Sequence, residues 1–287
     1  KNSQFEYPRG RITVNLAPAD IKKEGPAFDL PIALGVLAST GQISFNVLRE
    51  FVFLGELALN GKIRPVKGVL PIALSLRKSA IRKLIVPKDN AYEAAIIKEI
   101  DVYPVESLQE VAYLLSNFLE KKPLKLEIDE LIEKKEYDVD FSEVKGQYLV
   151  KRALEIAASG FHNILMIGPP GSGKTMLAKR LPTILPQMTT EEIFETTKIY
   201  SIAGLLHKEM PLVTTRPFRA VHHTSSDIAL VGGGQNPKPG EVSLSHNGVL
   251  FLDELAEFKR NELEVLRQPL EEGKITISRA ASSLTLP

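Results

Sequence analysis

The sequence predicts a protein of mixed α/β and α+β class, built from two parts that a charged segment joins. Three observations lead to this prediction. Short β-rich runs alternate with helical stretches over residues 1–119, and charged residues dominate residues 120–140. From residue 141 an apolar run enters a glycine-rich loop and a helix, and a later apolar run ends in two acids. This order is typical of a parallel sheet with crossover helices.

The composition fits this class and excludes several others. The 287 residues suit two domains of ordinary size, with 44% hydrophobic and 25% charged residues. The chain has no cysteine, which excludes disulfides and thiolate metal sites and agrees with a reducing, cytoplasmic location. No apolar run approaches the ~20 residues of a membrane span. The net charge of +1 provides no overall basic field for nucleic acid.

In the first part we expect helices over Leu30–Ala38 and Leu108–Phe118. The β-rich runs are RITVNLA from Arg11, FVFLGELAL from Phe51, RKLIVP from Arg82 and IDVYPV from Ile100. The charged segment, Glu120–Asp140, is expected to be a solvated linker with at most one helical turn. A partner-binding segment is the alternative interpretation.

The second part begins at Phe141 with a helix over Tyr148–Ser159 and an apolar strand, NILMIG. A glycine loop follows, and a further helix starts at Lys174. Beyond it we expect a strand in GVLFLDE, a helix in ELEVLRQPL and a hairpin arm in KITISRA.

The glycine loop reads GPPGSGKT and fits G-x-x-x-x-G-K-[ST] without substitution. Its glycines permit backbone angles closed to other residues and let amide N–H groups approach phosphate oxygens. The next helix directs its N-terminus at the same oxygens. The predicted ATP-binding residues are Gly168, Pro169, Pro170, Gly171, Ser172, Gly173, Lys174 and Thr175, with Lys174 on the β and γ phosphates and Thr175 on Mg²⁺. A chance glycine-rich turn is the alternative, which the flanking strand and helix patterns disfavour.

The second apolar run, VLFLDE, ends in Asp253 and Glu254. Adjacent residues of a strand point in opposite directions, so the two carboxylates can serve different purposes. Asp253 is expected to orient Mg²⁺, usually through water, and Glu254 to polarise the attacking water as general base. Together with Lys174 these acids predict ATP hydrolysis and not merely binding.

The segment VKGQYLVKRALEIAASGFHNILMIGPPGSGKT resembles the start of an AAA+ module. The resemblance implies that the V-x-G-Q residues Val144, Gly146 and Gln147 lie near the adenine, with Met176 following the loop. It also implies a ring, a hexamer of this chain in the whole protein, in which a neighbour completes each ATP site.

The stretch Arg216–Phe258 resembles the magnesium-chelatase-like AAA+ group, and within it the ComM/YifB proteins. The shared features are His222-His223, Gly232–Gly234, Asn236–Glu241 and Ser245–Gly248. Val221 departs from the family, where proline is expected. The histidines could be a metal pair, but adjacent side chains point apart in an extended segment, so we expect them to shape the insert. The glycines are expected to form a flexible turn, with a pore or substrate loop as the alternative.

Three stretches of the first part, KEGPAFDLPIALGVLAS, GELALNGKIRPVKGVL and IRKLIVPKDN, resemble the proteolytic domain of Lon, of the ribosomal S5 domain 2-like fold. The resemblance places Ala27 at the serine nucleophile and Leu70 at the activating lysine. Neither side chain can do that chemistry. Ser39, Lys67 and Lys78 are the nearest substitutes and have no motif around them. A Lon-like fold without protease activity is therefore expected.

The domain order predicts a Lon-like domain over 1–119, a linker over 120–140 and a truncated AAA+ P-loop domain over 141–287. For the ComM/YifB family the implied activity is an ATP-driven motor on DNA that promotes branch migration, linked to natural transformation and recombination. The alternative is a chelatase-type ATPase that remodels a protein without nucleic acid. The candidate DNA contacts are Arg77, Lys78, Arg82 and Lys83, which a solvated helix face explains as well.

The chain stops where an AAA+ module would continue, so we expect a fragment. The sensor strand, the arginine finger and the helical lid are expected beyond it. Arg267 and Arg279 are the candidates for contacts to a neighbouring subunit. We expect the chain alone to bind nucleotide weakly and to hydrolyse it poorly.

Overall fold

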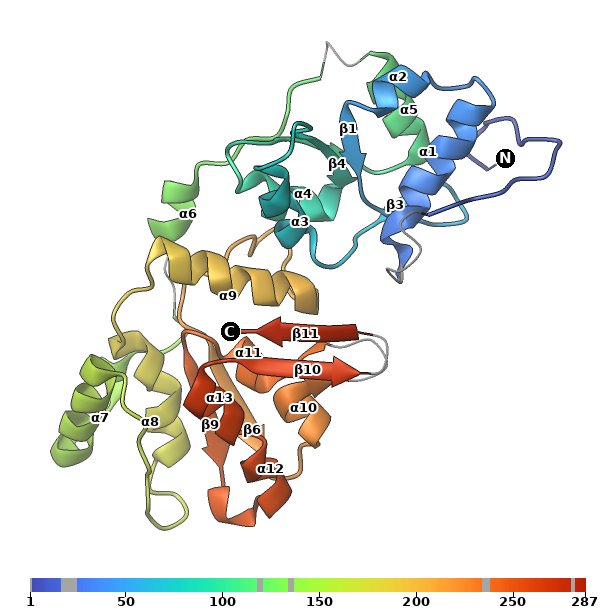
Figure 1. Cartoon of the computed structure of the whole chain (residues 1–287). Coiled ribbons are helices and arrows are strands. Elements are labelled where there is room, and N and C mark those ends of the chain that lie inside the picture. Colours follow the sequence, from blue (N-terminus) through green and yellow to red (C-terminus); the bar gives the residue numbers. More distant parts are fainter. Residues whose placement is uncertain (1, 17–24, 118–120, 134–136, 234–237, 280–281) are drawn as a thin grey trace. The chain divides into compact units, whose positions relative to one another are not determined.

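The chain folds into two compact units of mixed α/β structure, shown in a computed structural model (Figure 1). Unit 1 comprises Lys1–Ile128 and Ser201–Leu212, and unit 2 comprises Asp129–Tyr200 and Val213–Pro287. The residues that the structure describes are 2–16, 25–117, 121–133, 137–233, 238–279 and 282–287. Parallel strands occur in both units, which confirms the mixed α/β class. The domain boundaries expected from the sequence stay a prediction.

Unit 1 is built on a three-stranded parallel sheet in the order β1-β4-β5. Its strands are β1 (Phe51–Phe53), β4 (Lys83–Pro87) and β5 (Asp101–Val105), each within a run that the sequence predicts. The sheet is buried on both faces, because the successive side chains Leu84, Ile85 and Val86 are all inaccessible to solvent.

Both predicted helices of the first part are confirmed as α1 (Asp29–Ser39) and α5 (Leu108–Ser116). Leu34 of α1 and Leu114 of α5 belong to one buried cluster with Ile85 of the sheet. The remaining elements of unit 1 are η1 (Pro26–Phe28), α2 (Phe45–Leu48), β2 (Glu56–Leu57), β3 (Ile63–Arg64), α3 (Val69–Leu76) and α4 (Lys88–Ala95). Helix α6 (Ile128–Glu133), within the charged segment, begins at Ile128 of unit 1 and continues in unit 2.

The strand predicted for RITVNLA is wrong. Its described part, residues 11–16, has no β pairing, and the apolar side chains of Ile12, Val14 and Leu16 are exposed. A strand exists only where a neighbour accepts and donates its backbone hydrogen bonds. No described strand lies beside these residues, so their β-rich composition is not enough. Ala17 lies outside the described residues.

A buried polar cluster joins the residues after Tyr200 to the Lon-like part of unit 1. Glu93 of α4 accepts hydrogen bonds from Ser201 Oγ at 2.6 Å, from Asn90 Nδ2 at 2.7 Å and from the Leu70 amide at 3.3 Å. Asn90 in turn bonds both backbone groups of Val66 at 2.8 Å. Burial raises the pKa of Glu93, and its three hydrogen bonds oppose the shift.

This raised pKa predicts that Glu93 stabilises unit 1 most in acid. A carboxyl whose folded pKa exceeds the unfolded value binds its proton more tightly when folded, so its stabilisation is complete below the unfolded pKa of about 4.3. The stabilisation is lost as the pH rises through the folded pKa. We therefore expect wild-type urea midpoints to fall relative to Glu93→Gln as the pH rises above about 4.5. The exposed Glu127→Gln variant should track the wild type, and parallel profiles for Glu93→Gln would contradict the prediction.

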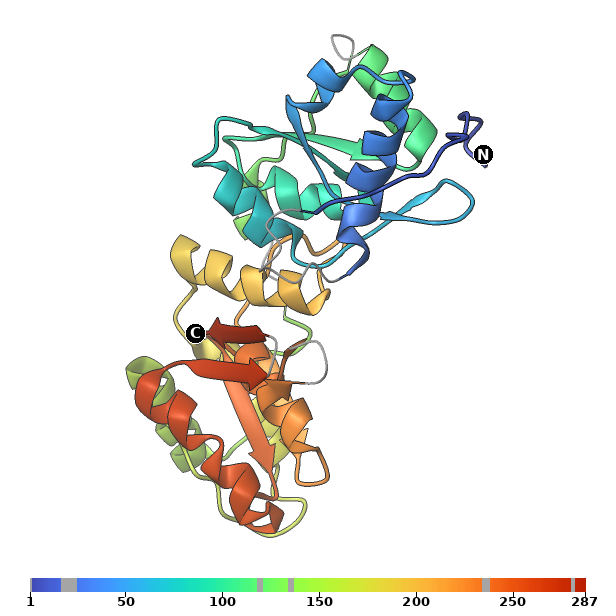
Figure 2. The same ribbon diagram turned by 45° about the vertical axis from the view of Figure 1, so that its right-hand side comes forward.

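Unit 2 contains a parallel pair of strands, β6 (Phe218–His222) and β9 (Val249–Asp253), which run side by side in both views (Figures 1 and 2). Their register pairs His222 with Asp253. The other elements of unit 2 are η3 (Phe141–Glu143), α7 (Tyr148–Gly160), α8 (Lys174–Arg180), η4 (Leu181–Ile184), α9 (Thr190–Ala203, which ends in unit 1), α10 (Asp227–Val231), β7 (Gly232–Gly233), β8 (Lys238–Pro239), α11 (Glu241–Leu244), η5 (Leu255–Glu257), α12 (Arg260–Glu264), α13 (Arg267–Glu272), β10 (Ile275–Arg279) and β11 (Ser282–Leu286).

Most of the elements predicted for the second part are confirmed. The helices at Tyr148 and Lys174, the strand in GVLFLDE and the hairpin arm in KITISRA all form, and β10 pairs with β11 in antiparallel fashion. The single helix predicted for ELEVLRQPL is instead divided between α12 and α13. The cause is Pro269, which has no N–H for the carbonyl of Val265 and is tolerated in the first turn of α13.

The strand predicted for NILMIG is wrong. Residues 163–168 have no β pairing, and the Ile167 side chain is 91% exposed. An apolar run becomes a strand only when a sheet edge receives it. In the described part of unit 2, β6 and β9 pair with each other alone. The glycine loop is therefore approached by unpaired chain.

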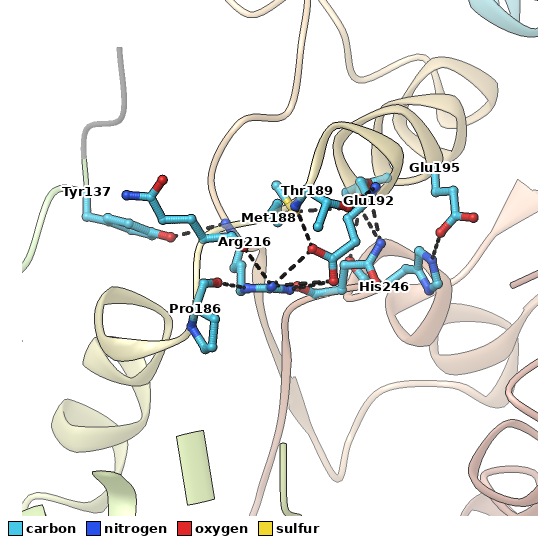
Figure 3. A network of polar contacts seen from close by, with 11 residues as sticks. Tyr137, Pro186, Met188, Thr189, Glu192, Glu195, Arg216 and His246 are labelled. Atoms are coloured by element: carbon cyan, nitrogen blue, oxygen red, sulfur yellow. Dashed lines mark hydrogen bonds and ion pairs between the residues drawn. The ribbon is translucent and has the colours of Figure 1, made fainter. Parts of the chain in front are cut away.

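Arg216 anchors the segment that precedes β6 through several hydrogen bonds and an ion pair (Figure 3). Its side chain is only 3% exposed. The guanidinium donates to the carbonyl oxygens of Pro186 at 2.5 Å and Asn247 at 2.7 Å, and it lies 3.2 Å from a Glu192 carboxylate oxygen of α9. Because Asn247 lies two positions before β9, and Arg216 two positions before β6, this one side chain holds α9 and the entries to both parallel strands together.

Candidate functional site

The glycine loop turns sharply into α8. Gly171 has a φ of 77° and Gly173 a φ of 89°, in the left-handed region that favours glycine. Gly173 is also the N-cap of α8, so its conformation sets where the helix begins. A side chain at either position would strain the turn that brings Lys174 and Thr175 to the loop.

Lys174 directs its ammonium group back over the loop. Nζ donates to the carbonyl oxygens of Gly168 at 2.7 Å and Pro169 at 3.0 Å. The positive charge is therefore held within the eight-residue motif, where the sequence predicts phosphate binding.

Thr175 and Asp253 meet although 78 positions separate them. Thr175 Oγ1 lies 3.4 Å from Asp253 Oδ2, which joins the first turn of α8 to the end of β9. A hydroxyl and a carboxylate are hard oxygen ligands of the kind that Mg²⁺ prefers, and Mg²⁺ commonly takes one or two carboxylates together with phosphate oxygens and water. These two residues therefore fit the predicted magnesium site.

The three residues predicted near the adenine, and Met176, lie in two different environments. Gln147 has a φ of 51° and donates from Nε2 to the Ser172 carbonyl at 3.3 Å, which places it against the loop. Gly146 precedes it, also with positive φ. The Val144 side chain is buried with Leu154 and Leu177, and Met176 packs against the same cluster.

Glu254 follows β9 in a left-handed conformation, with φ 57°. Its Oε2 lies 3.1 Å from His222 Nε2 and 3.0 Å from His223 Nδ1. The expectation that the two histidines point apart is wrong, since their ring centroids are 4.1 Å apart. The reason is that β6 ends at His222, so the alternation of an extended strand no longer holds at His223.

Sequence reasoning missed this group of three residues. A signal for it was present in the sequence. The histidines end the run FRAVHH, and Glu254 ends the run VLFLDE; if both runs are parallel strands of one sheet, their carboxyl ends lie at the same edge. The other family features are described only in part. Gly234, Asn236, Pro237 and the side chain of Arg279 lie outside the described residues.

The two residues that the resemblance matches to the Lon dyad lie in helical elements of unit 1. Ala27 lies in η1, and Leu70 is fully buried in α3. Ser39 Oγ donates to the Val36 carbonyl of its own helix, and Lys67 Nζ donates to the Ala203 carbonyl. In the described structure no hydrogen bond joins Ser39 to Lys67 or to Lys78.

None of the described helices is long and apolar enough to cross a membrane.

Comparison with known proteins identifies the family. Residues 140–287 match the model described as "Magnesium chelatase, subunit ChlI", and residues 1–90 match "Subunit ChlI of Mg-chelatase". The chain is 51% identical to Competence protein ComM of Haemophilus influenzae over 296 residues and 46% identical to protein YifB of Escherichia coli over 290 residues. These matches cover all of this chain and 56% of each relative, so the chain spans about half the length of these curated relatives.

Part of the chain also matches Lon protease 2 of Bacillus subtilis, at 31% identity over 117 residues. That match covers 39% of this chain and 20% of the protease. It confirms the predicted likeness to Lon. With a family model covering more than half of its residues, the chain belongs to the magnesium chelatase, subunit ChlI, family, and is an AAA+ protein of the ComM/YifB type.

Proposed function

We propose that the protein is a Mg²⁺-dependent AAA+ ATPase that works as a hexameric motor on DNA in the cytoplasm. Its activity would be ComM-like branch migration, linked to natural transformation and recombination. The 51% identity to a protein named Competence protein ComM supports this proposal. Ala27 and Leu70 support the absence of protease activity, because neither can supply a nucleophile or a base.

The contact between Thr175 and Asp253 carries the proposal, because it brings the glycine loop and the acidic strand end into one site. In this site the Lys174 side chain and the backbone N–H groups of residues 171–175 would bind the phosphates. Thr175 and Asp253 would hold Mg²⁺, which when bound neutralises the charge of the triphosphate.

The remaining predicted site residues complete the proposal. Gln147, Gly146 and Met176 would border the nucleotide at the adenine side, and Val144 would support them from the core. Glu254 would accept a proton from the attacking water. A neighbouring subunit would supply an arginine to complete the site.

Basic side chains of unit 1 are the candidate DNA contacts. Arg77, Lys78 and Arg82 line a concavity of about 390 Å³ together with Leu74 and Glu99. Arg77 is paired with Glu99 at 2.5 Å. Lys83, the fourth cation of the run, pairs instead with Glu50 at 2.7 Å. We propose that the cations around the concavity contact DNA phosphates, a mode that needs charge and no base recognition.

The test is ATP hydrolysis by the whole protein with and without single-stranded and branched DNA. We expect DNA to stimulate hydrolysis and Lys174→Ala to abolish the stimulated rate. The variant should also bind ATP at least tenfold more weakly, since charge-assisted hydrogen bonds contribute about 1.5–3 kcal/mol. Lys179→Ala, which removes an exposed cation from the same helix, should behave as wild type. Robust hydrolysis indifferent to DNA would instead favour the protein-remodelling alternative.

A further inference from the structure

The carboxyl ends of β6 and β9 bring two imidazoles and one carboxylate to a single point. His222 Nε2 and His223 Nδ1 both lie about one hydrogen-bond length from the same oxygen, Glu254 Oε2, at 3.1 and 3.0 Å. All three ligand atoms lie within 4.8 Å of one another. Among the described residues, this is the only such group of three or more histidine, aspartate or glutamate side chains.

One ring nitrogen of His223 lacks a hydrogen-bond partner among the described residues. Its Nδ1 atom is shielded from solvent and has no hydrogen bond of acceptable geometry in the described structure, in spite of its short distance to Glu254. A shielded ring nitrogen without a hydrogen bond is costly unless another ligand satisfies it. Its lone pair, in the neutral imidazole, is available to a metal ion.

The distances from Glu254 to the two histidines suit a tetrahedral ion. Bonds of 2.0–2.2 Å to nitrogen and oxygen place neighbouring ligand atoms of a tetrahedral zinc site about 3.3–3.5 Å apart. The observed separations of 3.0 and 3.1 Å are within a few tenths of an ångström of that geometry. We propose that His222 Nε2, His223 Nδ1 and Glu254 Oε2 bind a divalent transition-metal ion, zinc in the first instance.

The surroundings of His222 agree with this role. A metal-binding histidine usually donates its other ring N–H to an oxygen, which fixes the ring. The Nδ1 atom of His222 lies 3.1 Å from the Thr224 hydroxyl, which can accept that hydrogen bond. The Thr224 amide N–H also points at Nδ1, at 3.4 Å, and metal binding at Nε2 would replace this longer contact by the hydrogen bond to the hydroxyl. The His222 and Glu254 side chains are about half exposed, so water can fill the fourth position and the ion can enter.

The ligand chemistry separates this site from the magnesium site. Imidazole nitrogens suit zinc and its neighbours in the transition series, whereas Mg²⁺ prefers oxygen ligands. Mg²⁺ would therefore be held at Thr175 and Asp253, and zinc at the adjacent histidines.

The site would also regulate hydrolysis, a consequence that rests on the proposed function. Zinc bound to Glu254 would engage the carboxylate that is proposed to accept a proton from the attacking water. ATP binding would persist, because the described contacts of Lys174 and Thr175 do not include the histidines. Zinc would thus hold the ATPase in a nucleotide-bound state that does not turn over.

The direct test is zinc binding by the metal-free whole protein, measured by competition with a chromophoric chelator and by the visible absorption of Co²⁺ in the same site. We expect the wild type to bind one more zinc ion per chain than the double variant of His222 and His223, and to retain it in millimolar Mg²⁺. His222→Asn and His223→Asn should each weaken binding at least tenfold, and the double variant should abolish it. His246→Asn is the matched control, because His246 lies 3.3 Å from Glu195 as a single histidine–glutamate pair.

Circular dichroism checks that each variant is folded. No zinc binding by the wild type, or unchanged binding by the folded double variant, would overturn the site. ATP hydrolysis titrated with zinc tests the consequence separately. Loss of hydrolysis in the wild type but not in the double variant supports regulation. Zinc binding without any effect on a measurable rate overturns regulation alone, and a protein that never hydrolyses ATP overturns the proposed function while the binding result still decides the site.

Discussion

Replacing Glu254 by glutamine is expected to lower ATP turnover about 10²- to 10⁴-fold, the range that a positioned general base contributes. Glutamine has the same shape as glutamate but cannot accept a proton. Nucleotide affinity should change little, because the proposed phosphate and magnesium contacts belong to Lys174, Thr175 and Asp253. Single-turnover hydrolysis measures the rate, and a fluorescent nucleotide measures the affinity.

Glu257→Gln provides the control for this experiment. Glu257 is exposed, lies three positions further along the chain in η5, and loses the same charge when replaced. It should retain the wild-type rate. Equal losses in both variants would point to a general effect of charge at this edge of the sheet, and a Glu254→Gln variant with normal turnover would remove Glu254 from the proposed chemistry.

Replacing Arg216 by methionine is expected to lower the free energy of unfolding of unit 2 by about 1–3 kcal/mol, the usual cost of leaving a buried hydrogen-bond acceptor without its donor. The Glu192 carboxylate is 27% exposed and can be hydrated once Arg216 is removed. The substitution keeps a long side chain but removes all of its donors. The carbonyl oxygens of Pro186 and Asn247 and the Glu192 carboxylate would each lose a hydrogen bond or ion pair (Figure 3).

Hydrogen exchange of the amides in α9, β6 and β9, with urea unfolding, measures this cost. Arg267→Met is the matched control, since the Arg267–Glu271 pair at 2.7 Å is exposed on α13 and pairs of that kind contribute about 0–1 kcal/mol. A loss for Arg216→Met no larger than for Arg267→Met would show that the buried network does not stabilise the unit.

The local sequence was enough to predict four of the helices and the glycine loop. Helices α1, α5, α7 and α8 follow from apolar patterns and neighbouring residues, and the backbone of Gly171 and Gly173 has the positive φ that a glycine loop allows. The expected replacement of both Lon dyad positions, by Ala27 and Leu70, also rests on the sequence alone.

Strand pairing was not predictable in the same way. RITVNLA and NILMIG have the composition of strands, yet their described residues do not pair, whereas VLFLD pairs with the FRAVH run of β6. A helix satisfies its backbone within one segment, but a strand depends on a partner distant in the chain. Composition alone therefore predicts more strands than the described structure contains in these runs.

The sequence by itself determined the nature of the groups at the candidate site: a glycine loop with Lys174 and Thr175, and an apolar strand ending in Asp253 and Glu254. Only the tertiary structure decided which of them meet. It brought Thr175 to Asp253, turned both histidines toward Glu254, and buried Arg216 between α9 and the parallel strands. These contacts join residues remote in the chain, and the packing of strands and helices sets their distances, which no local pattern encodes.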